Sequence, residues 1–369
     1  MKKIFFYCGD GNSLIDFRGH LIKKYIANGF EVFANTPNIK QDNLRLLQSW
    51  GVRVIDSNIQ RKSINLFSSL RELFQLIGCI LRNKPSIIFA YTHKPVLVAA
   101  FAGFICRVPN VVSLITGTGH LFDNYDFKTK FRRFIGLFLF RIALTFSHKV
   151  IFQNPDNLEL FLALRLVKKD KTHIVNGSGV DLEKFAYHPL PNNKTFLCLA
   201  RLIKSKGLLE YAKAAKIIKD EHPGYTFLLG GPEDAHIDSI PVDEIKNEWG
   251  ERYGVEYIGN VSKPYDAIKE CDVYVLLSYN EGTPRSVLEA LATGRPVITT
   301  DVPGCRETVN HAQNGYLVEV ASVESTVKYM LQIMQSNLPK MSLESRKFAE
   351  KKYDVHTINN KIFNIIDNV

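Results

Sequence analysis

The segment Glu281-Gly282-Thr283-Pro284-Arg285-Ser286-Val287-Leu288-Glu289 holds the residues of this chain that are best suited to chemistry. It follows an apolar run and opens a predicted helix, so the first backbone N–H groups of that helix, beside Gly282, would face a phosphate or sugar oxygen. Glu289, one turn into the helix, has the two carboxylate oxygens that could accept both hydroxyls of a ribose. Alone, this pattern describes a capped helix with two surface acids, so a second feature is needed.

The second feature is a pair of cations, Arg201 and Lys206, in the segment that follows another apolar run. An arginine can bind a phosphate through two parallel hydrogen bonds, and a lysine acts as a compact positive charge. Together they suit a diphosphate whose negative charge grows as it leaves. Either cation alone would be read as a solvated surface residue; with the Glu281 segment they predict a diphosphate-binding site.

The elements that must position these residues follow an alternation of short apolar strands and amphipathic helices. This alternation predicts α/β domains with parallel sheets covered on both faces. Strands are expected in the first half at 4–8, 31–34, 52–55, 86–91, 110–115, 149–152 and 173–175, and in the second half at 195–200, 225–229, 255–258, 273–277 and 296–300.

The alternation stops in the polar, proline-bearing stretch His188-Pro189-Leu190-Pro191-Asn192-Asn193, which reads as a linker. We therefore expect two Rossmann-like, doubly wound domains, residues 1–190 and 191–353, with a C-terminal helix at about 354–369 packing back on the first. Ligands bind at the carboxyl ends of such sheets, so a cleft is expected there.

Composition and charge narrow the function further. The chain has 369 residues, of which 46% are hydrophobic and 23% charged, which excludes a disordered or collagen-like protein. Its net charge of +10 lies in the first half, because residues 1–190 carry 26 lysines and arginines against 13 acids. No nucleic-acid-binding motif accompanies this charge, so an anionic substrate or membrane is expected instead. The six cysteines form no C-x-x-C pair, so neither a zinc site nor a disulfide framework is expected.

The motifs of the second half resemble those of glycosyltransferase family 4, the retaining enzymes of the GT-B fold. The resemblance is specific over about 195–318 and rests on the motifs Arg201-x4-Lys206-Gly207, Gly230-Gly231-Pro232, Ile258-Gly259-Asn260-Val261, Glu281-Gly282-x-Pro284-x4-Glu289-Ala290 and Gly294-Arg295-Pro296. The chain is most similar to the subgroup that builds bacterial O-antigen and capsule chains on a polyprenyl diphosphate carrier, in particular to its N-acetylgalactosaminyltransferases.

The resemblance implies a role for each residue of the donor site. Arg201 and Lys206 would bind the diphosphate and Glu289 the ribose, while Glu281 would orient the hydroxyls of the donor sugar. Further donor contacts are implied at Gly231, Val261, Gly282, Thr283, Pro284, Arg285 and Ser286. The donor phosphate itself would take the acceptor proton, so no cofactor and no divalent metal is expected.

The first half departs from the family pattern. Many members carry a histidine just after the strand at 110–115, where this chain reads Thr116-Gly117-Thr118-Gly119-His120. His120 is a candidate catalytic residue for the same space, and Thr116, Gly117 and Gly119 are candidates for acceptor binding. A solitary histidine is as often structural.

Four more residues of the first half are candidate ligand contacts. Gly9 and Gly11 follow the first strand and could approach the donor phosphate. Arg18 could meet an acceptor diphosphate, and His93 is a further acceptor-site candidate. As a dinucleotide fingerprint Gly9-x-Gly11 is weak, because Leu14 stands where the third glycine is required.

Two helical segments, 66–84 and 128–141, combine basic residues with phenylalanine and leucine runs. They could lie on an anionic membrane, although we expect their apolar faces to be mostly sheet-covering core. No run is long enough to span a bilayer, so we expect an enzyme in the cytoplasm at the inner face of the bacterial inner membrane.

These features predict a retaining hexosyltransferase that moves N-acetylgalactosamine, or another N-acetylhexosamine, from a UDP-sugar to a polyprenyl-diphosphate-linked saccharide. UDP-galactose, UDP-glucose or GDP-mannose are alternative donors for the same acceptor class. A UDP-sugar 2-epimerase of the same fold and a non-catalytic assembly partner are alternatives of another class.

Overall fold

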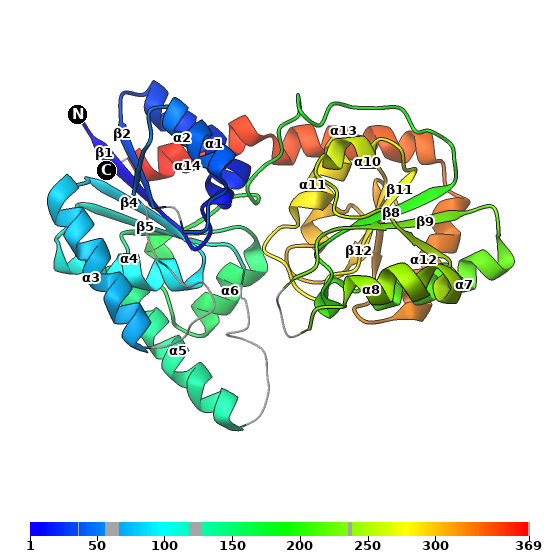
Figure 1. The fold of residues 1–369 in the computed structure, drawn as a ribbon, viewed down its shortest axis with the longest axis horizontal. Helices are drawn as coiled ribbons and strands as arrows, with labels where there is room; N and C mark the ends of the chain where they lie inside the picture. The colour runs from blue at the N-terminus through cyan, green and yellow to red at the C-terminus, as the bar shows by residue number, and fades with distance from the viewer. Residues whose placement is uncertain (36, 56–65, 118–126, 235–237, 368–369) are drawn as a thin grey trace. The chain divides into compact units, whose positions relative to one another are not determined.

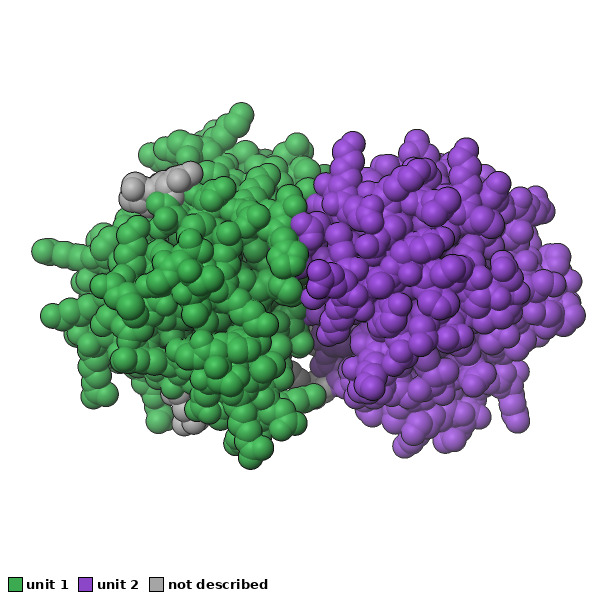
Figure 2. Space-filling view, turned by 90° about the horizontal axis from the view of Figure 1, so that it is seen from above, with its two compact units in different colours: residues 1–178, 356–369 green, residues 179–355 purple. Residues whose placement is uncertain are grey.

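The computed structural model describes residues 1–35, 37–55, 66–117, 127–234 and 238–367, with the side chains of 66, 67 and 127–133 left aside. The chain divides into two compact units, Met1–Ser178 with His356–Val369, and Gly179–Val355 (Figures 1 and 2). Both are α/β units with a parallel sheet. The α/β class predicted from the alternating pattern is confirmed.

The first unit is built on a seven-stranded parallel sheet of order β3-β2-β1-β4-β5-β6-β7. Its central strands β1, β4 and β5 are buried on both faces, which is why they read as nearly continuous apolar runs. The elements are β1 (Lys3–Tyr7), α1 (Asn12–Ala27), β2 (Glu31–Asn35), α2 (Gln41–Ser49), β3 (Arg53–Ile55), α3 (Leu66–Asn83), β4 (Ile87–Tyr91), α4 (His93–Ile105), β5 (Asn110–Ile115), α5 (Phe127–Phe146), β6 (Lys149–Phe152), α6 (Pro155–Ala163), η2 (Lys169–Lys171), β7 (Thr172–Ile174) and α14 (Val355–Asp367).

The second unit holds a six-stranded parallel sheet of order β10-β9-β8-β11-β12-β13. Its last strand, β13, lies beyond the strands expected from the sequence. The elements are β8 (Thr195–Leu199), η3 (Lys204–Lys206), α7 (Leu208–Glu221), β9 (Thr226–Gly230), α8 (Val242–Glu244), the π-helix η4 (Ile245–Trp249), α9 (Gly250–Tyr253), β10 (Val255–Tyr257), α10 (Pro264–Ile268), β11 (Val273–Leu276), α11 (Arg285–Ala292), β12 (Val297–Thr300), η5 (Arg306–Thr308), β13 (Gly315–Val318), α12 (Val323–Met334) and α13 (Leu338–Tyr353).

The stretch expected as a linker belongs to the second unit, which begins at Gly179 and not near 191. The fully buried guanidinium of Arg295 donates hydrogen bonds to the carbonyls of His188 and Pro189. The carboxylate of Asp272 accepts from the backbone N–H of Asn192 at 2.8 Å. A buried arginine needs several acceptors, so these contacts hold the segment against the unit.

The C-terminal helix α14 belongs to the first unit from His356 onward. Its residues Ile358, Ile362 and Ile366 are buried in the same core as Tyr25. Asn110 Nδ2 donates to the carbonyl of Ile366 at 2.9 Å, which ties the end of the helix to the sheet.

Candidate functional site

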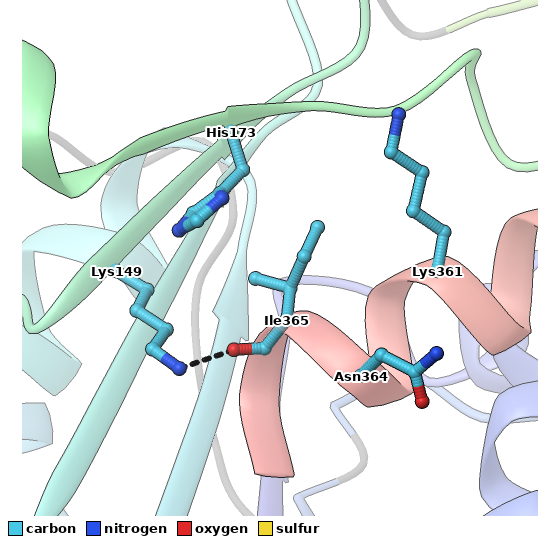
Figure 3. Close-up of a pocket in the computed structure, with 5 residues that line it drawn as sticks. All are labelled: Lys149, His173, Lys361, Asn364 and Ile365. Carbon is cyan, nitrogen blue, oxygen red and sulfur yellow. Dashed lines mark hydrogen bonds between the residues drawn. The ribbon is translucent and has the colours of Figure 1, made fainter. Parts of the chain in front are cut away.

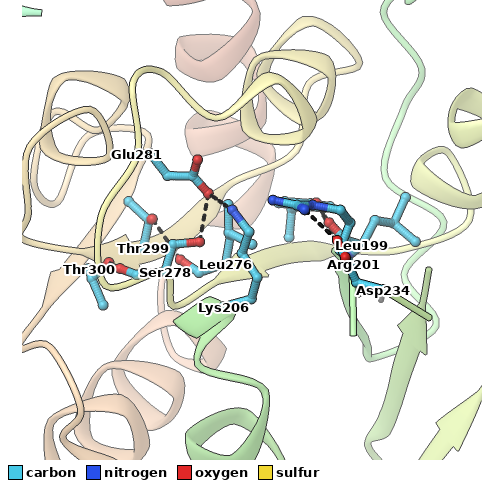
Figure 4. Close-up of polar contacts among 10 residues, drawn as sticks. Leu199, Arg201, Lys206, Asp234, Leu276, Ser278, Glu281, Thr299 and Thr300 are labelled. Atoms are coloured by element: carbon cyan, nitrogen blue, oxygen red, sulfur yellow. Dashed lines mark hydrogen bonds and ion pairs between the residues drawn. The ribbon is translucent and has the colours of Figure 1, made fainter. Parts of the chain in front are cut away.

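The strongest polar cluster of the second unit joins Lys206, Glu281 and Ser278 (Figure 4). Lys206 Nζ forms an ion pair with Glu281 Oε1, and Ser278 Oγ donates to the same oxygen at 2.8 Å. The Lys206 and Glu281 side chains are only 15% and 17% exposed. Lys206 follows β8 and Glu281 follows β11, which are neighbours in the sheet although far apart in sequence. The pair therefore lies at the carboxyl edge where the strand order reverses, the usual ligand position in such sheets.

Two glycines fix the backbone on either side of this cluster. Gly207, at φ +68°, lies so close to Leu277 that an added Cβ would come within 2.2 Å of the Leu277 carbonyl oxygen. A Cβ added to Gly304, which has φ +83°, would come within 2.4 Å of the Glu281 carbonyl oxygen and 2.6 Å of the Gly282 carbonyl oxygen. Both need a positive φ and no side chain, so glycine sets where Lys206 and Glu281 stand.

The wall behind the ion pair is a network of buried hydroxyls and thiols. Thr300 Oγ1 donates to the Ser278 carbonyl, and Thr299 Oγ1 donates to the Leu276 carbonyl at 2.7 Å. Burial, with the nearby Glu281 carboxylate, raises the pKa of Cys305 to about 12. Burial likewise raises the pKa of Cys198 to about 12, although the Lys206 charge opposes that shift. Both thiols are therefore protonated at neutral pH and are not nucleophiles.

Arg201, the second predicted cation, pairs with a different carboxylate. Its guanidinium forms an ion pair with Asp234, and its side chain is 52% exposed (Figure 4). Both cations come from the segment between β8 and α7, as predicted. Sequence analysis did not point to Asp234 or Ser278, because neither stands in a motif that suggests its partner.

The helix α11 begins directly after Pro284, as the motif predicts. Glu289 is buried in its second turn and accepts a hydrogen bond from Arg285 Nε at 2.8 Å. Gly282 and Pro284 are buried, whereas Thr283, Arg285 and Ser286 are partly exposed. The Ser286 side chain also bonds the phenol of Tyr274, a residue of the neighbouring strand β11.

The predicted donor contacts Gly231 and Val261 lie at the same sheet edge. Gly231 has φ +148°, and a Cβ there would stand 1.8 Å from the Ala200 carbonyl oxygen. Its N–H donates to the Gly259 carbonyl at 2.9 Å. The Val261 side chain lies against Gly230, where an added Cβ would meet Val261 Cγ2 at 2.8 Å. These contacts bring the loops after β8, β9 and β10 together.

In the first unit, Gly9 and Gly11 occupy the loop between β1 and α1. Gly11 donates its N–H to the Pro37 carbonyl at 2.8 Å, so this loop is held by the one after β2. Ser13 Oγ lies 2.8 Å from the hydroxyl of Tyr91 at the end of β4. The loop therefore lies where the strand order reverses between β1 and β4.

Arg18 and His93 are more enclosed than the sequence suggested. Arg18 is 1% exposed, and its guanidinium lies 5.3 Å from the centroid of the Tyr91 ring. His93 opens α4, with its ring edge-on to Phe140 at 5.6 Å. Thr92, just before it, has φ +70° and ψ 158°, a conformation that costs a non-glycine residue about 1–3 kcal/mol and is typical of functional sites. Their acceptor roles stay predictions.

The remaining candidates follow β5. Thr116 and Gly117 are partly exposed at the end of that strand, and Gly117 has φ +150°. Gly119 and His120 lie outside the described residues. The roles of all four stay predictions.

A cationic pocket of about 470 Å³, lined by Lys149, His173, Lys361, Asn364 and Ile365, lies in the first unit (Figure 3). The sequence did not point to it. Lys149, at the start of β6, donates to the Ile365 carbonyl near the end of α14. Burial, with the charges of Lys149 and Lys361, lowers the pKa of His173. The pocket lies at the amino end of its strands, and Lys149 there caps a helix.

In the part of the chain that the structure describes, no three His, Cys, Asp or Glu side chains are grouped to hold a metal ion. The expectation that the donor needs no divalent metal stays a prediction, as do the donor-binding roles of Lys206 and Arg201.

Family models match both units. Residues 17–177 match the model described as a glycosyl transferase 4-like domain, and residues 181–353 match glycosyl transferases group 1. A Campylobacter jejuni relative, named N,N'-diacetylbacillosaminyl-diphospho-undecaprenol alpha-1,3-N-acetylgalactosaminyltransferase, is 26% identical over 100% of this chain and 99% of its own. An Escherichia coli relative, named UDP-Gal:alpha-D-GlcNAc-diphosphoundecaprenol alpha-1,3-galactosyltransferase, is 24% identical over 74% of this chain and 72% of its own.

Solved structures show the same fold. A glycosyltransferase from Rickettsia africae has a TM-score of 0.77 at 17% identity, covering 100% of this chain and 98% of its own. Anabaena HepE, in complex with UDP and glucose, has a TM-score of 0.76 at 18% identity, with 100% of both chains covered. The GT-B fold predicted from the sequence is confirmed.

Proposed function

Because this chain is a glycosyltransferase built from a glycosyl transferase 4-like domain and a group 1 domain, we propose that it is a retaining enzyme using a UDP-sugar. The donor sugar is N-acetylgalactosamine or another N-acetylhexosamine, and the acceptor is a polyprenyl-diphosphate-linked saccharide of bacterial surface polysaccharide synthesis. The full-length relative from Campylobacter jejuni, named as such a transferase, supports donor and acceptor.

The observation that carries the proposal is the cluster of Lys206, Glu281 and Ser278 at the edge of β8 and β11. In this proposal Lys206 Nζ binds the donor diphosphate, whose charge increases as the glycosidic bond breaks. A fixed cation in a mostly buried site stabilises such charge far better than water does. Glu281, held by Lys206 and Ser278, then orients the hydroxyls of the donor sugar.

The α11 helix completes the donor site. The backbone from Gly282 to Ser286 presents a helix N-terminus to the sugar and phosphate oxygens, and Glu289 accepts the ribose hydroxyls. In the free protein Arg285 occupies the Glu289 carboxylate, and Asp234 pairs with Arg201. On donor binding Arg201 would turn from Asp234 to the diphosphate, whereas the two-oxygen carboxylate of Glu289 can accept ribose hydroxyls beside Arg285.

We propose that the donor needs no divalent metal, because Lys206 and Arg201 supply the charge that a metal would otherwise provide. The acceptor hydroxyl attacks the anomeric carbon while its proton passes to the departing donor phosphate. The α-1,3 linkages in the names of both relatives support retention, since an α-linked UDP-sugar would give an α-linked product.

The test is a transfer assay with a polyprenyl-diphosphate N-acetylhexosamine acceptor and a panel of UDP-N-acetylgalactosamine, UDP-N-acetylglucosamine, UDP-galactose, UDP-glucose and GDP-mannose. We expect the N-acetylhexosamine donors to be preferred and the product to be α by NMR. The reaction should survive EDTA. Glu281→Gln should lower kcat at least 100-fold, and Glu344→Gln, at a partly exposed acid on α13, should not. Transfer from no member of the panel, or an absolute requirement for Mg²⁺, would contradict the proposal.

The E. coli relative's name favours UDP-galactose as a second candidate donor, which the same panel distinguishes. None of the described helices combines the length and apolar character needed to cross a bilayer. We propose that the enzyme reaches its lipid-linked acceptor as a peripheral protein at the inner face of the bacterial inner membrane.

A further inference from the structure

Three neighbouring helices of the first unit form an apolar surface that the fold does not cover. The helix α4 packs between α3 and α5 (Figure 1). Large apolar side chains of all three helices are exposed, and we call this surface the α3–α5 face. Its members are Leu70, Phe74 and Leu81 on α3, Phe104 and Ile105 on α4, and Phe134, Ile135, Phe138 and Leu139 on α5.

On α3 the exposed residues form one stripe. Leu70, Phe74 and Leu81 recur at the helical period, so they lie on the same side of the helix. Phe74 is 68% exposed and Leu81 is 60% exposed. Leu76 and Ile80, on the other side, are buried in the core of the unit. The helix is therefore apolar on two faces, and packing against the sheet needs only one.

The helix α5 repeats this arrangement. Phe140 and Leu144 are buried in the same core, as expected from the sequence, but Phe134 is 69% exposed and Phe138 is 56% exposed. The expectation that the apolar residues of this segment are mostly core is thus wrong for the exposed stripe. The ring of Phe104 on α4 stacks on that of Phe146 on α5, with the ring centroids 3.9 Å apart. This contact connects the apolar residues of α4 and α5.

The charge of the α3–α5 face has a single sign. Glu72 is the only acid in the sequences of α3, α4 and α5. It is 4% exposed, and its carboxylate binds Lys94 Nζ at 2.7 Å, so its charge is buried and neutralised. Five of the described basic residues on or next to these helices are exposed: Arg71, Arg82, Lys84, Arg107 and Arg141.

We propose that the α3–α5 face docks the first unit on an anionic lipid bilayer, with the phenylalanine and leucine side chains in the headgroup region and the arginines on lipid phosphates. The inference deepens the proposed function, on which it rests, because a polyprenyl-linked acceptor lies in a bilayer. Charge decides the occupant: two copies of one cationic face repel each other, whereas an anionic bilayer complements both the charge and the apolar side chains.

The experiment is flotation of the full chain with vesicles of phosphatidylglycerol and phosphatidylcholine, and with phosphatidylcholine alone, at low and high salt. The apolar test variant is Phe74→Ser with Phe138→Ser, and the charge variant is Arg82→Glu with Arg141→Glu. Leu343→Ser is the matched control, because Leu343 is a 50% exposed leucine on α13 of the second unit. Calorimetric binding of UDP and the oligomeric state by sedimentation are measured for every variant.

We expect the wild type to float with the anionic vesicles and to be released by salt. Each pair of substitutions should lower the apparent partition at least tenfold, since one basic residue near an anionic bilayer contributes roughly fivefold. Leu343→Ser should float like the wild type. The proposal is overturned if the wild type does not float, if the Phe74 and Phe138 double variant floats equally well, or if that variant only dissociates a dimer. UDP binding does not depend on the α3–α5 face. If the wild type does not bind UDP, the proposed function fails and the docking surface is not contradicted.

Discussion

The ion pair between Lys206 and Glu281 gives the most exacting test of the donor site. We consider the double-mutant cycle of Lys206→Met and Glu281→Gln, which keeps the size of each side chain and removes its charge. An exposed pair contributes up to about 1 kcal/mol, and removing one partner of a fully buried pair costs roughly 3–5 kcal/mol. With exposures of 15% and 17%, and a further hydrogen bond from Ser278, the pair lies between these limits. We expect a coupling energy of about 1–3 kcal/mol.

The assay is urea unfolding followed by the fluorescence of Trp249, which is buried in the second unit. The chain has only two tryptophans, so a Trp50→Phe background makes Trp249 the sole reporter. The exposed pair Lys216–Asp220 on α7, with side chains 47% and 59% exposed, is the matched control. Its cycle should give a coupling energy within about 0.5 kcal/mol.

The same variants separate binding from transfer. Lys206→Met should weaken UDP binding about 10- to 100-fold, because a charge-assisted hydrogen bond contributes roughly 1.5–3 kcal/mol. Glu281→Gln should bind UDP at least as tightly as the wild type, since Lys206 is then released from its carboxylate, yet transfer should be lost. A coupling energy below about 0.5 kcal/mol, or unchanged UDP binding by Lys206→Met, would refute this reasoning.

Three further changes test other parts of the structure. Gly231→Ala should abolish UDP binding or destabilise the second unit by several kcal/mol, because the added Cβ would stand 1.8 Å from the Ala200 carbonyl oxygen. Calorimetry measures UDP binding and thermal unfolding measures stability. A variant with the melting curve and the UDP affinity of the wild type would contradict this prediction. Arg295→Met should cost roughly 3–5 kcal/mol in urea unfolding, since it removes the buried guanidinium that donates to the carbonyls of Cys271, His188, Pro189 and Thr293. A loss under about 1 kcal/mol would show that the 188–193 segment does not depend on Arg295. Burial, followed by the Lys171 charge, lowers the pKa of His148, whose Nδ1 accepts a hydrogen bond from the Val111 N–H at 3.0 Å. Below about pH 6.5 the unfolded chain therefore binds more protons than the folded chain, so the stability contributed by neutral His148 should be full above that pH and fall as the pH drops below it. His148→Gln should reduce this fall, measured as melting temperature against pH.

Much of the local structure of the proposed donor site could be predicted from the sequence. The motif from Glu281 to Glu289 has the same loop and helix start in the structure because glycine, proline and the apolar helix positions act over a few residues. The parallel strands were visible for a similar reason, since strands buried on both faces read as short apolar runs. The positions of Arg201 and Lys206 after β8 followed from that pattern.

The pairings within the site were decided by tertiary structure. That Lys206 meets Glu281, whereas Arg201 meets Asp234, depends on which strands are neighbours and on the close backbone approaches at Gly207 and Gly304. A local pattern does not state the order of strands in a sheet, so it could not choose between these partners.

The first unit shows the same division. The sequence alone indicated that the first half is basic and that two of its helical segments, 66–84 and 128–141, are rich in phenylalanine and leucine. Only the tertiary packing decided which of these side chains cover the sheet and which remain exposed. It also decided that Glu72 is buried and paired with Lys94. When a helix is apolar on two sides, its sequence pattern does not show which side is buried, because that depends on the elements it packs against.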